Sequence, residues 1–301
     1  MTYAVPVQEG PEDLPTPMIS GTRKTTGTRE LLVNLTMREV RSQFKRTTLG
    51  RLWSFINPLA TIAIYSMVFG YILQSPIQPG VNSGIHFFAL FLASALIPWT
   101  FLSGAIVSGM GSIVNNAGLL SKVYFPRFIL PVSTILAMTV TFAIELGLLT
   151  VIMAFVGGPK VLLFLPGLIL MMALTVLFCV GVALMLSIAM VYFRDTQHFM
   201  NIFIQLWFYA TPIIYSETLV LQLQDKVWAK GWTLFGQPFP FFFLYNLNPA
   251  ARITGAFRAM LYDYVWPSWR DWFAVTVWTV LVLALGTVVF RKFSARVVEE
   301  L

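Results

Sequence analysis

The stretch LLFLPGLILMMALTVLFCVGVALMLSIAMVY, residues Leu162–Tyr192, decides the class of fold. It contains no charged residue. It is also longer than the roughly 20 apolar residues that a helix needs to cross a bilayer. The sequence therefore predicts a membrane span here.

The composition of the whole chain agrees with this prediction. Of its 301 residues, 57% are hydrophobic and 11% are charged, whereas soluble domains have roughly 45–50% and about 25%. These proportions exclude a soluble enzyme, a disordered chain and a nucleic-acid binder, in spite of the net charge of +7. One cysteine, Cys179, and two separated histidines, His86 and His198, predict no disulfide and no metal site.

Six segments are predicted to span the membrane. They are Leu52–Leu73, Ile85–Val107, Phe128–Phe155, Leu162–Tyr192, the shorter Met200–Tyr215, and Trp272–Phe290. With both termini inside, fourteen of the twenty basic residues lie on the inner side, eight of them before the first span. This asymmetry fits the positive-inside rule. We expect an all-α polytopic membrane protein with six transmembrane helices, both termini inside, and a spanning domain over residues 52–292.

Other segments are not expected to span. Residues 1–27, with four prolines, are predicted to be a disordered cytosolic tail. Thr28–Arg46 is predicted to be an amphipathic interfacial helix with Thr28 as its N-cap, and residues 28–51 to form an entrance region. Residues 216–271 are too long for a simple hairpin, and their apolar stretch Phe235–Leu247 contains two prolines and is too short to cross. We therefore expect re-entrant or interfacial helices there. Residues 293–301 form the cytosolic C-terminal end.

Polar side chains recur along one face of two predicted spans. Helical spacing groups Asn57, Thr61 and Tyr65 in the first span within an arc of about 80°, with Ser54. The fifth span groups His198, Asn201, Gln205, Tyr209 and Ser216 in the same way. Such stripes either join packed helices by hydrogen bonds or line a conduit for a hydroxyl-rich solute, to which Tyr and Trp, including Trp53, offer flat faces.

Charged residues near the membrane allow two interpretations each. Glu145 lies near the middle of the third span and is either a functional acid or a hydrogen-bonded structural one, with Thr141 as a possible partner. A basic cluster precedes the first span: Arg38, Arg41, Lys45, Arg46 and Arg51. The cluster either attracts anionic lipid headgroups or captures a lipid-linked diphosphate, which Arg can bind in a bidentate manner.

The chain has no sign of its own catalytic chemistry. It contains no nucleotide-binding loop of the form GxxxxGK[ST], and Asp263 and Asp271 resemble interfacial polar residues more than an acid–base pair. If transport is powered, the motor is expected on another chain. An ATP-independent flippase or carrier, or a membrane-embedded glycan transferase, remains the alternative, although the chain has one mid-span acid and no evident repeat.

Several motifs together resemble the permease subunits of bacterial ABC-2 type polysaccharide exporters, which move O-antigen, teichoic acid or cell-wall galactan. The similar stretches are LGRLWSFINPL (Leu49–Leu59), NNAGLLSKVYFPRFILP (Asn115–Pro131), FRD (Phe193–Asp195), TPIIY (Thr211–Tyr215) and NLNPAARITGAFRAML (Asn246–Leu261). The resemblance covers residues 28–301, and its overall appearance is nearest to the mycobacterial galactan exporters.

The resemblance implies a partner and a mechanism. Two such permeases would work with two cytosolic ATPase subunits, which bind ATP and Mg, while this chain holds no cofactor. The cargo would be a polyprenyl-diphosphate-linked glycan, such as cell-wall galactan, exported across the bacterial plasma membrane. Gly109–Leu120 would form the helix that couples to the ATPase, with Ser112, Asn115, Asn116 and Leu119 at the contact. Residues 218–264 would gate the outer exit, and the tyrosine-bearing stripes would contact the sugars.

Overall fold

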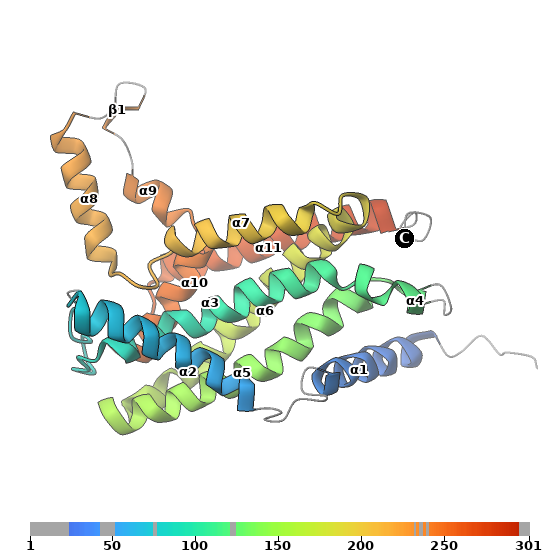
Figure 1. Cartoon of the computed structure of the whole chain (residues 1–301), viewed down its shortest axis with the longest axis horizontal. Coiled ribbons are helices and arrows are strands. Elements are labelled where there is room, and N and C mark those ends of the chain that lie inside the picture. The colour runs from blue at the N-terminus through green and yellow to red at the C-terminus, as the bar shows by residue number, and fades with distance from the viewer. Residues whose placement is uncertain are drawn as a thin grey trace, which may run out of the picture.

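The computed structural model describes residues 24–42, 52–74, 77–120, 125–231, 233–234, 237–238 and 241–294. These residues are helical apart from turns, connecting loops and one small hairpin, in which β1 (Thr233–Leu234) pairs antiparallel with β2 (Gln237–Pro238). The helices run mostly along the long axis of the molecule (Figure 1). The all-α prediction is therefore confirmed for the described part of the chain.

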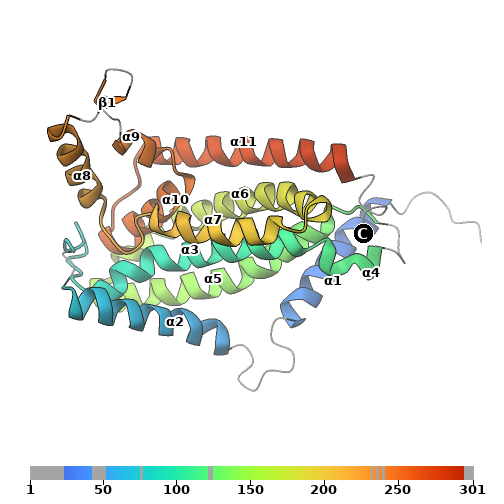
Figure 2. The same ribbon diagram turned by 45° about the horizontal axis from the view of Figure 1, so that its top comes forward.

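Four helices in the described residues are long and apolar enough to cross a membrane. They are α3 (Phe88–Gly111), α5 (Ile129–Gly157), α6 (Leu165–Tyr192) with the preceding turn η4 (Pro159–Phe164), and α11 (Trp269–Phe293). The most apolar part of α3 is 72% buried, against 22% for α11. Helix α3 therefore forms the centre of the bundle, and α11 lies at its edge (Figure 2).

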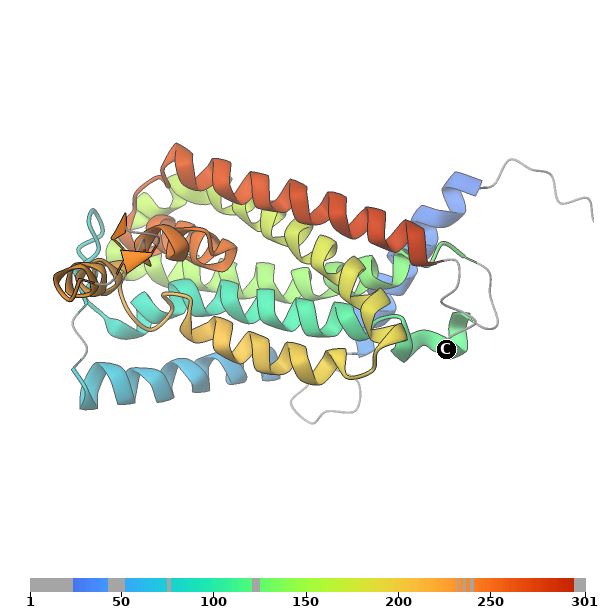
Figure 3. The same ribbon diagram turned by 90° about the horizontal axis from the view of Figure 1, so that it is seen from above.

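Close packing of α6 against α11 depends on two glycines. A Cβ atom built on Gly286 would lie 2.2 Å from the carbonyl oxygen of Gly181, and one built on Gly181 would lie 2.7 Å from the Cα of Leu283. Small residues let the backbones of membrane helices approach each other, and dispersion contacts then replace the missing hydrophobic driving force. This contact joins α11 to the rest of the bundle (Figure 3).

Two shorter helical segments flank this group. The first is α2 (Trp53–Tyr65), which continues without a break as the π-helical turn η2 (Ser66–Ile72). The second is α7 (Thr196–Tyr209), with 14 residues. Because α7 ends at Tyr209, the prediction of one helix over Met200–Tyr215 was wrong at its end: Ala210–Tyr215 forms turns that contain Pro212, and proline has no N–H to continue a helix.

One end of the bundle carries short helices between α7 and α11. They are α8 (Glu217–Ala229), α9 (Phe241–Asn246), α10 (Pro249–Arg258) and η5 (Ala259–Asp263). Helix α10 begins at an Asn–Pro pair, where Asn248 accepts a hydrogen bond from the N–H of Ala250, a favoured start for a helix. The prediction of short, non-spanning helices between residues 216 and 271 agrees with this arrangement.

The opposite end carries α1 (Lys24–Ser42), η3 (Val114–Asn116), α4 (Ala117–Leu120) and the C-terminal end of α11 (Figure 1). Helix α1 begins at Lys24, so Thr28 is not its N-cap, and residues 24–27 do not belong to a disordered tail. Residues 1–23 lie outside the described chain, as does the predicted continuation of this helix from residue 43 to Arg46. We call the two ends of the molecule the α1 end and the α8 end.

Candidate functional site

At the α1 end, two segments with different predicted roles lie in contact. Arg38, from the predicted entrance, donates a hydrogen bond of 2.6 Å from Nη2 to Oδ1 of Asn116, from the predicted coupling segment. Asn116 also donates from Nδ2 to the carbonyl oxygen of Ser112, at 2.8 Å. The amide of Asn116 is therefore fixed at both ends, between α1 and the end of α3.

An apolar contact supports this polar one. Leu35 of α1 is 7% exposed and packs with Phe125, Ile129 and Leu130 at the start of α5. Leu119, in the short helix α4, lies partly buried against the same cluster. Helix α1 thus buries one apolar stripe, as its amphipathic pattern predicts, and rests on both α4 and α5.

The coupling segment is not a single helix over Gly109–Leu120. Helix α3 continues to Gly111 before the chain turns into η3 and α4. Ser112 is buried and donates from its hydroxyl to the carbonyl oxygen of Gly109, at 2.7 Å, which ties the turn to the end of α3. Asn115 is exposed, so it is the predicted contact residue most accessible to a partner.

The basic cluster is described only in part. Arg38 and Arg41 are exposed on α1. Lys45, Arg46 and Arg51 lie outside the described residues, and so does the side chain of Trp53. The described arginines therefore place positive charge on the surface of the α1 end.

The two predicted stripes approach each other at their tyrosines. The ring of Tyr65 stacks near that of Phe208, with centroids 6.1 Å apart, and Tyr209 is the next residue on α7. A cavity of about 230 Å³ lies there, lined by Phe69 of η2 and by Phe208, Tyr209 and Tyr215 of the α7 region. The approach is at the α8 end of these helices.

The polar members of the stripes face away from the rest of the described chain. Asn57, Asn201, Gln205 and Tyr209 are exposed, and Thr61 is half-buried and bonds the carbonyl oxygen of Asn57 at 2.9 Å. None of the three amide side chains hydrogen-bonds another described helix. Their arrangement thus does not match polar links between helices of one chain, and it leaves these amides available to a solute or to another chain.

Glu145 lies on α5 and is half-buried. Among the described residues its carboxylate has no hydrogen-bond partner, and Thr141 does not supply one. The described residues contain no group of three or more His, Cys, Asp or Glu side chains that could hold a metal ion, around Glu145 or elsewhere.

A polar cavity at the α8 end was not predicted from the sequence. Its volume is about 540 Å³, within the range of roughly 300–1,000 Å³ typical of ligand pockets. Residues of α8, α9, α10, η5 and the start of α11 line it, including Glu217, Tyr245, Arg252, Arg258 and Asp271. We call it the α8 pocket.

Arg258 is the most buried charged residue of this pocket, with an exposed fraction of 8%. Its Nη1 and Nη2 donate to the carbonyl oxygens of Pro212 and Ile213, at 2.6 and 2.7 Å, and its guanidinium lies 3.9 Å from the centre of the Phe91 ring. Burial lowers the pKa of Arg258 to about 10, so it stays charged at neutral pH. Arg258 therefore ties the turn after α7 to α10.

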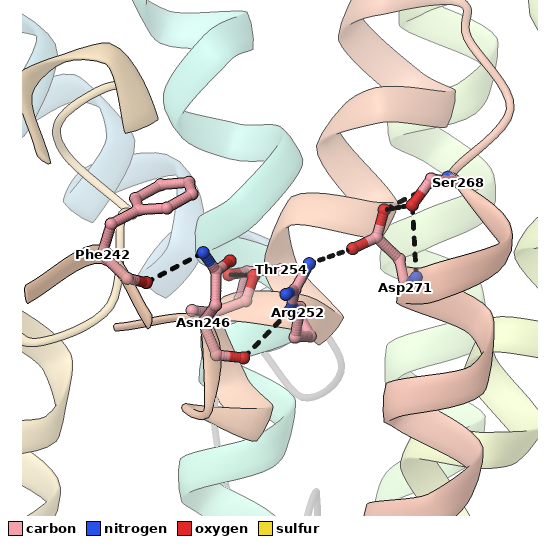
Figure 4. A network of polar contacts seen from close by, with 7 residues as sticks. Phe242, Asn246, Arg252, Thr254, Ser268 and Asp271 are labelled. Carbon is pink, nitrogen blue, oxygen red and sulfur yellow. Dashed lines mark hydrogen bonds and ion pairs between the residues drawn. The ribbon is translucent and has the colours of Figure 1, made fainter. Parts of the chain in front are cut away.

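Arg252 makes a second connection across the pocket (Figure 4). It donates from Nε to the carbonyl oxygen of Asn246, at 3.0 Å, and forms an ion pair with Asp271. Asp271 accepts a bond from the hydroxyl of Ser268 and completes the capping box at the start of α11. The short helix α9 is thus linked through Arg252 to a long helix.

Glu217 opens α8 and faces both arginines. Burial raises the pKa of Glu217, and the positive charges of Arg252 and Arg258 partly oppose that rise. The feature of the sequence that could have indicated this pocket is the pair Arg252 and Arg258 within a short, capped, amphipathic helix. The sequence did not show that residues of α8 and α9 line one cavity with this helix, because that arrangement joins distant residues.

Comparison with known proteins gives one family and several relatives. The family model described as ABC-2 type transporter matches residues 30–227. An O-antigen export system permease protein RfbA of Myxococcus xanthus is 27% identical over 94% of this chain and 100% of its own length. One of Klebsiella pneumoniae is 25% identical over 90% of this chain and 95% of its own length. The polysialic acid transport protein KpsM of Escherichia coli is 33% identical over 34% of this chain and 36% of its own length.

Proposed function

Because the chain belongs to the ABC-2 type transporter family, we propose that it is the membrane subunit of an ATP-driven exporter of a polyprenyl-diphosphate-linked polysaccharide, such as a cell-wall galactan. Two copies of this chain would assemble with two copies of a cytosolic ATPase, which holds ATP and Mg. The chain itself carries no catalytic site in this proposal. It sits in the bacterial plasma membrane and moves the glycan to the outer face.

One observation carries the proposal: the chain aligns over 94% of its length with a permease named for O-antigen export. A match of this extent includes both the α1 end and the α8 end of the molecule. The α1 end presents the exposed Arg38, Arg41 and Asn115. These features suit a cytosolic face that meets both a diphosphate and an ATPase.

The topology in this proposal has six spans with both termini in the cytosol. The four long helices supply four spans. The continuous helix of α2 and η2 supplies another, and α7 with its following turns supplies the sixth. Helix α1 and the C-terminal end of α11 lie at the same end of the bundle (Figure 1), which supports an even number of crossings.

The path of the glycan in this proposal runs between the two copies. The diphosphate is attracted by Arg38, Arg41, Lys45, Arg46 and Arg51, because arginine binds phosphate oxygens in pairs. The exposed Asn57, Asn201, Gln205 and Tyr209 then contact the sugars. ATP-driven closure of the partner moves Asn115 and its neighbours as a rigid segment, and α1 moves with them through the Arg38–Asn116 bond.

Deletion of this chain in its own host tests the proposal. We expect lipid-linked glycan to accumulate at the cytosolic face of the membrane while surface polymer is lost, and a plasmid copy of the chain to reverse both effects. Surface polymer that persists without accumulation inside would contradict an export role. Loss of surface polymer without any lipid-linked precursor would instead indicate a role in synthesis.

A further inference from the structure

The α8 pocket contains two buried polar atoms without partners among the described residues. They are Nε of Arg258 and the hydroxyl oxygen of Tyr245. A buried donor without a partner destabilises the fold, and more so when it is charged. Such atoms in a cavity are therefore candidates for binding a ligand.

Arg258 is held in place without the use of Nε. Its two terminal nitrogens are occupied by the carbonyl oxygens of Pro212 and Ile213, and the Phe91 ring covers its face. Nε is thus the one nitrogen of the fixed guanidinium that has no hydrogen-bond partner among the described residues. A donor fixed in this way needs no rearrangement when an acceptor arrives.

Acceptor groups lie beside these donors. Glu217 lines the same cavity and, within the described part of the chain, makes no hydrogen bond or ion pair. Glu217, Tyr245 and Arg258 act on one another electrostatically, which places them in one neighbourhood. The pocket thus offers a carboxylate acceptor, a phenol and an arginine N–H to a single ligand.

The charge of the lining disfavours a simple ion. Glu217, Asp263 and Asp271 balance three arginines, Arg252, Arg258 and Arg270. A phosphate or a metal cation would therefore gain little from net attraction. A neutral molecule with several hydroxyls can instead donate to the carboxylate and accept from the arginine at once.

Aromatic rings add a surface that suits a sugar ring. The rings of Phe242 and Tyr245 lie 17° from parallel, with centroids 6.1 Å apart, and both residues line the cavity. Aromatic faces bind the apolar face of a sugar while its hydroxyls reach the polar groups around it.

We propose that the α8 pocket is a carbohydrate-binding site, in which Glu217, Tyr245 and Arg258 hold one sugar unit of the exported glycan. This inference rests on the proposed export function and extends it, since it adds a binding site on the short helices outside the long bundle. Sugar binding there closes contacts among α8, α9 and α10. The site therefore retains the leading sugars at the end of the path farthest from the α1 end.

Hydrogen exchange on the intact complex with its ATPase tests the site. The probe is the lipid-free oligosaccharide that mild acid releases from the surface polymer of the same host, with inorganic phosphate as a comparison at equal concentration. We expect the oligosaccharide to slow exchange across α9 and α10, and phosphate to leave it unchanged. Tyr245→Phe and Glu217→Gln are each expected to raise the concentration needed for half of this effect about tenfold, since each removes one bond that involves a charged or buried group.

Two matched variants separate binding from folding. Asp225→Asn alters an exposed acid on α8 that does not line the pocket. Tyr264→Phe removes a hydroxyl that donates to the carbonyl oxygen of Met153, at 2.7 Å. We expect Asp225→Asn to change nothing, and Tyr264→Phe to lower thermal stability without changing the half-effect concentration.

The outcomes distinguish this inference from the export function. No slowing by oligosaccharide in a complex that exports polymer would overturn the pocket assignment alone. Slowing by phosphate without slowing by oligosaccharide would overturn it in favour of an anion site. Unchanged export after deletion of the chain would contradict the export function itself, whatever the exchange data.

Discussion

Arg38 in α1 donates a hydrogen bond to Asn116, 78 residues further along the chain, at 2.6 Å. The bond joins the interfacial helix to the segment between α3 and α5, and the apolar cluster around Leu35 and Leu119 joins them again. An exposed bond of this kind contributes little to folding, on the order of 1 kcal/mol or less. Its consequence is mechanical: a displacement of one segment is transmitted to the other.

Arg38→Ala and Asn116→Ala are therefore expected to uncouple export from ATP hydrolysis rather than to unfold the chain. Each variant should lower the glycan exported per ATP hydrolysed, and the double variant should be no worse than Arg38→Ala alone, because both substitutions remove the same bond. The measurement is surface polymer and ATPase activity in the same membranes. Arg29→Ala, an exposed arginine on the same helix, is the control; an equal loss in that variant would assign the effect to charge alone.

Charge reversal tests the capture of the diphosphate. Because Arg38 also bonds Asn116, the informative variant reverses Arg41 and Lys45 and keeps Arg38. We expect export to fall while membrane insertion and the amount of complex remain normal, since the lipid diphosphate loses its attraction to the surface. The triple variant that also reverses Arg38 should be more severe. Normal export in the triple variant would remove diphosphate capture from the account.

Gly286→Val tests the packing of α6 against α11. A Cβ at this position would overlap the Gly181 carbonyl oxygen at 2.2 Å, and that atom belongs to backbone that cannot rotate away. We expect a loss of stability of about 1–3 kcal/mol or more, the usual cost of overpacking, seen as a lower midpoint of thermal unfolding in lipid nanodiscs. Gly147→Ala in α5 is the matched control, because its Cβ would meet nothing within 4 Å. Equal midpoints for the two variants would contradict this packing.

Much of the bundle can be predicted from the sequence, because each long helix is determined by its own residues. The long apolar runs give α3, α5, α6 and α11 directly, since their length and composition suffice. The end of α7 was missed because apolar residues continue through Ile213 and Ile214, although the backbone turns at Thr211–Pro212. The apolar composition predicts a continuing helix, but the proline ends it.

The contacts between distant segments did not follow from the sequence. Arg38 and Asn116 were assigned to separate tasks, and no periodicity relates two residues so far apart. The α8 pocket needs residues of α8, α9 and α10 to line one cavity, and this brings Glu217 to the same cavity as the buried Arg258. Burial of charged residues is decided by tertiary packing, so a pattern of residue types does not reveal it.

The pH dependence of stability provides a test of Glu217. Burial raises the pKa of Glu217 above its ordinary value, so the folded chain holds this proton more tightly than the unfolded chain. Below the ordinary pKa of Glu217 the carboxyl is protonated in both states and does not lower the free energy of unfolding. As the pH rises from the ordinary pKa to the pKa in the folded chain, ionisation lowers the free energy of unfolding. Above the folded pKa this loss is complete. Glu217→Gln cannot ionise and should raise the unfolding midpoint at about pH 8 but not at about pH 4.

Asp225→Asn is the control for this titration, because Asp225 is exposed on the same helix. Its unfolding midpoint should follow that of the unmodified chain at both pH values. A stabilisation by Glu217→Gln that is equal at the two pH values would show that ionisation of Glu217 is not its cause. A destabilisation at about pH 8 would show that the carboxylate has a favourable partner.

If this chain forms the membrane half of an ATP-driven exporter, it should be extracted from its own host together with its ATPase, and native mass spectrometry of the complex detects that assembly. We expect a species with two copies of this 33.9 kDa chain and two copies of a second protein that hydrolyses ATP. A chain that is recovered alone or only with itself, under conditions that preserve other membrane complexes of that host, would contradict the account and favour an ATP-independent carrier.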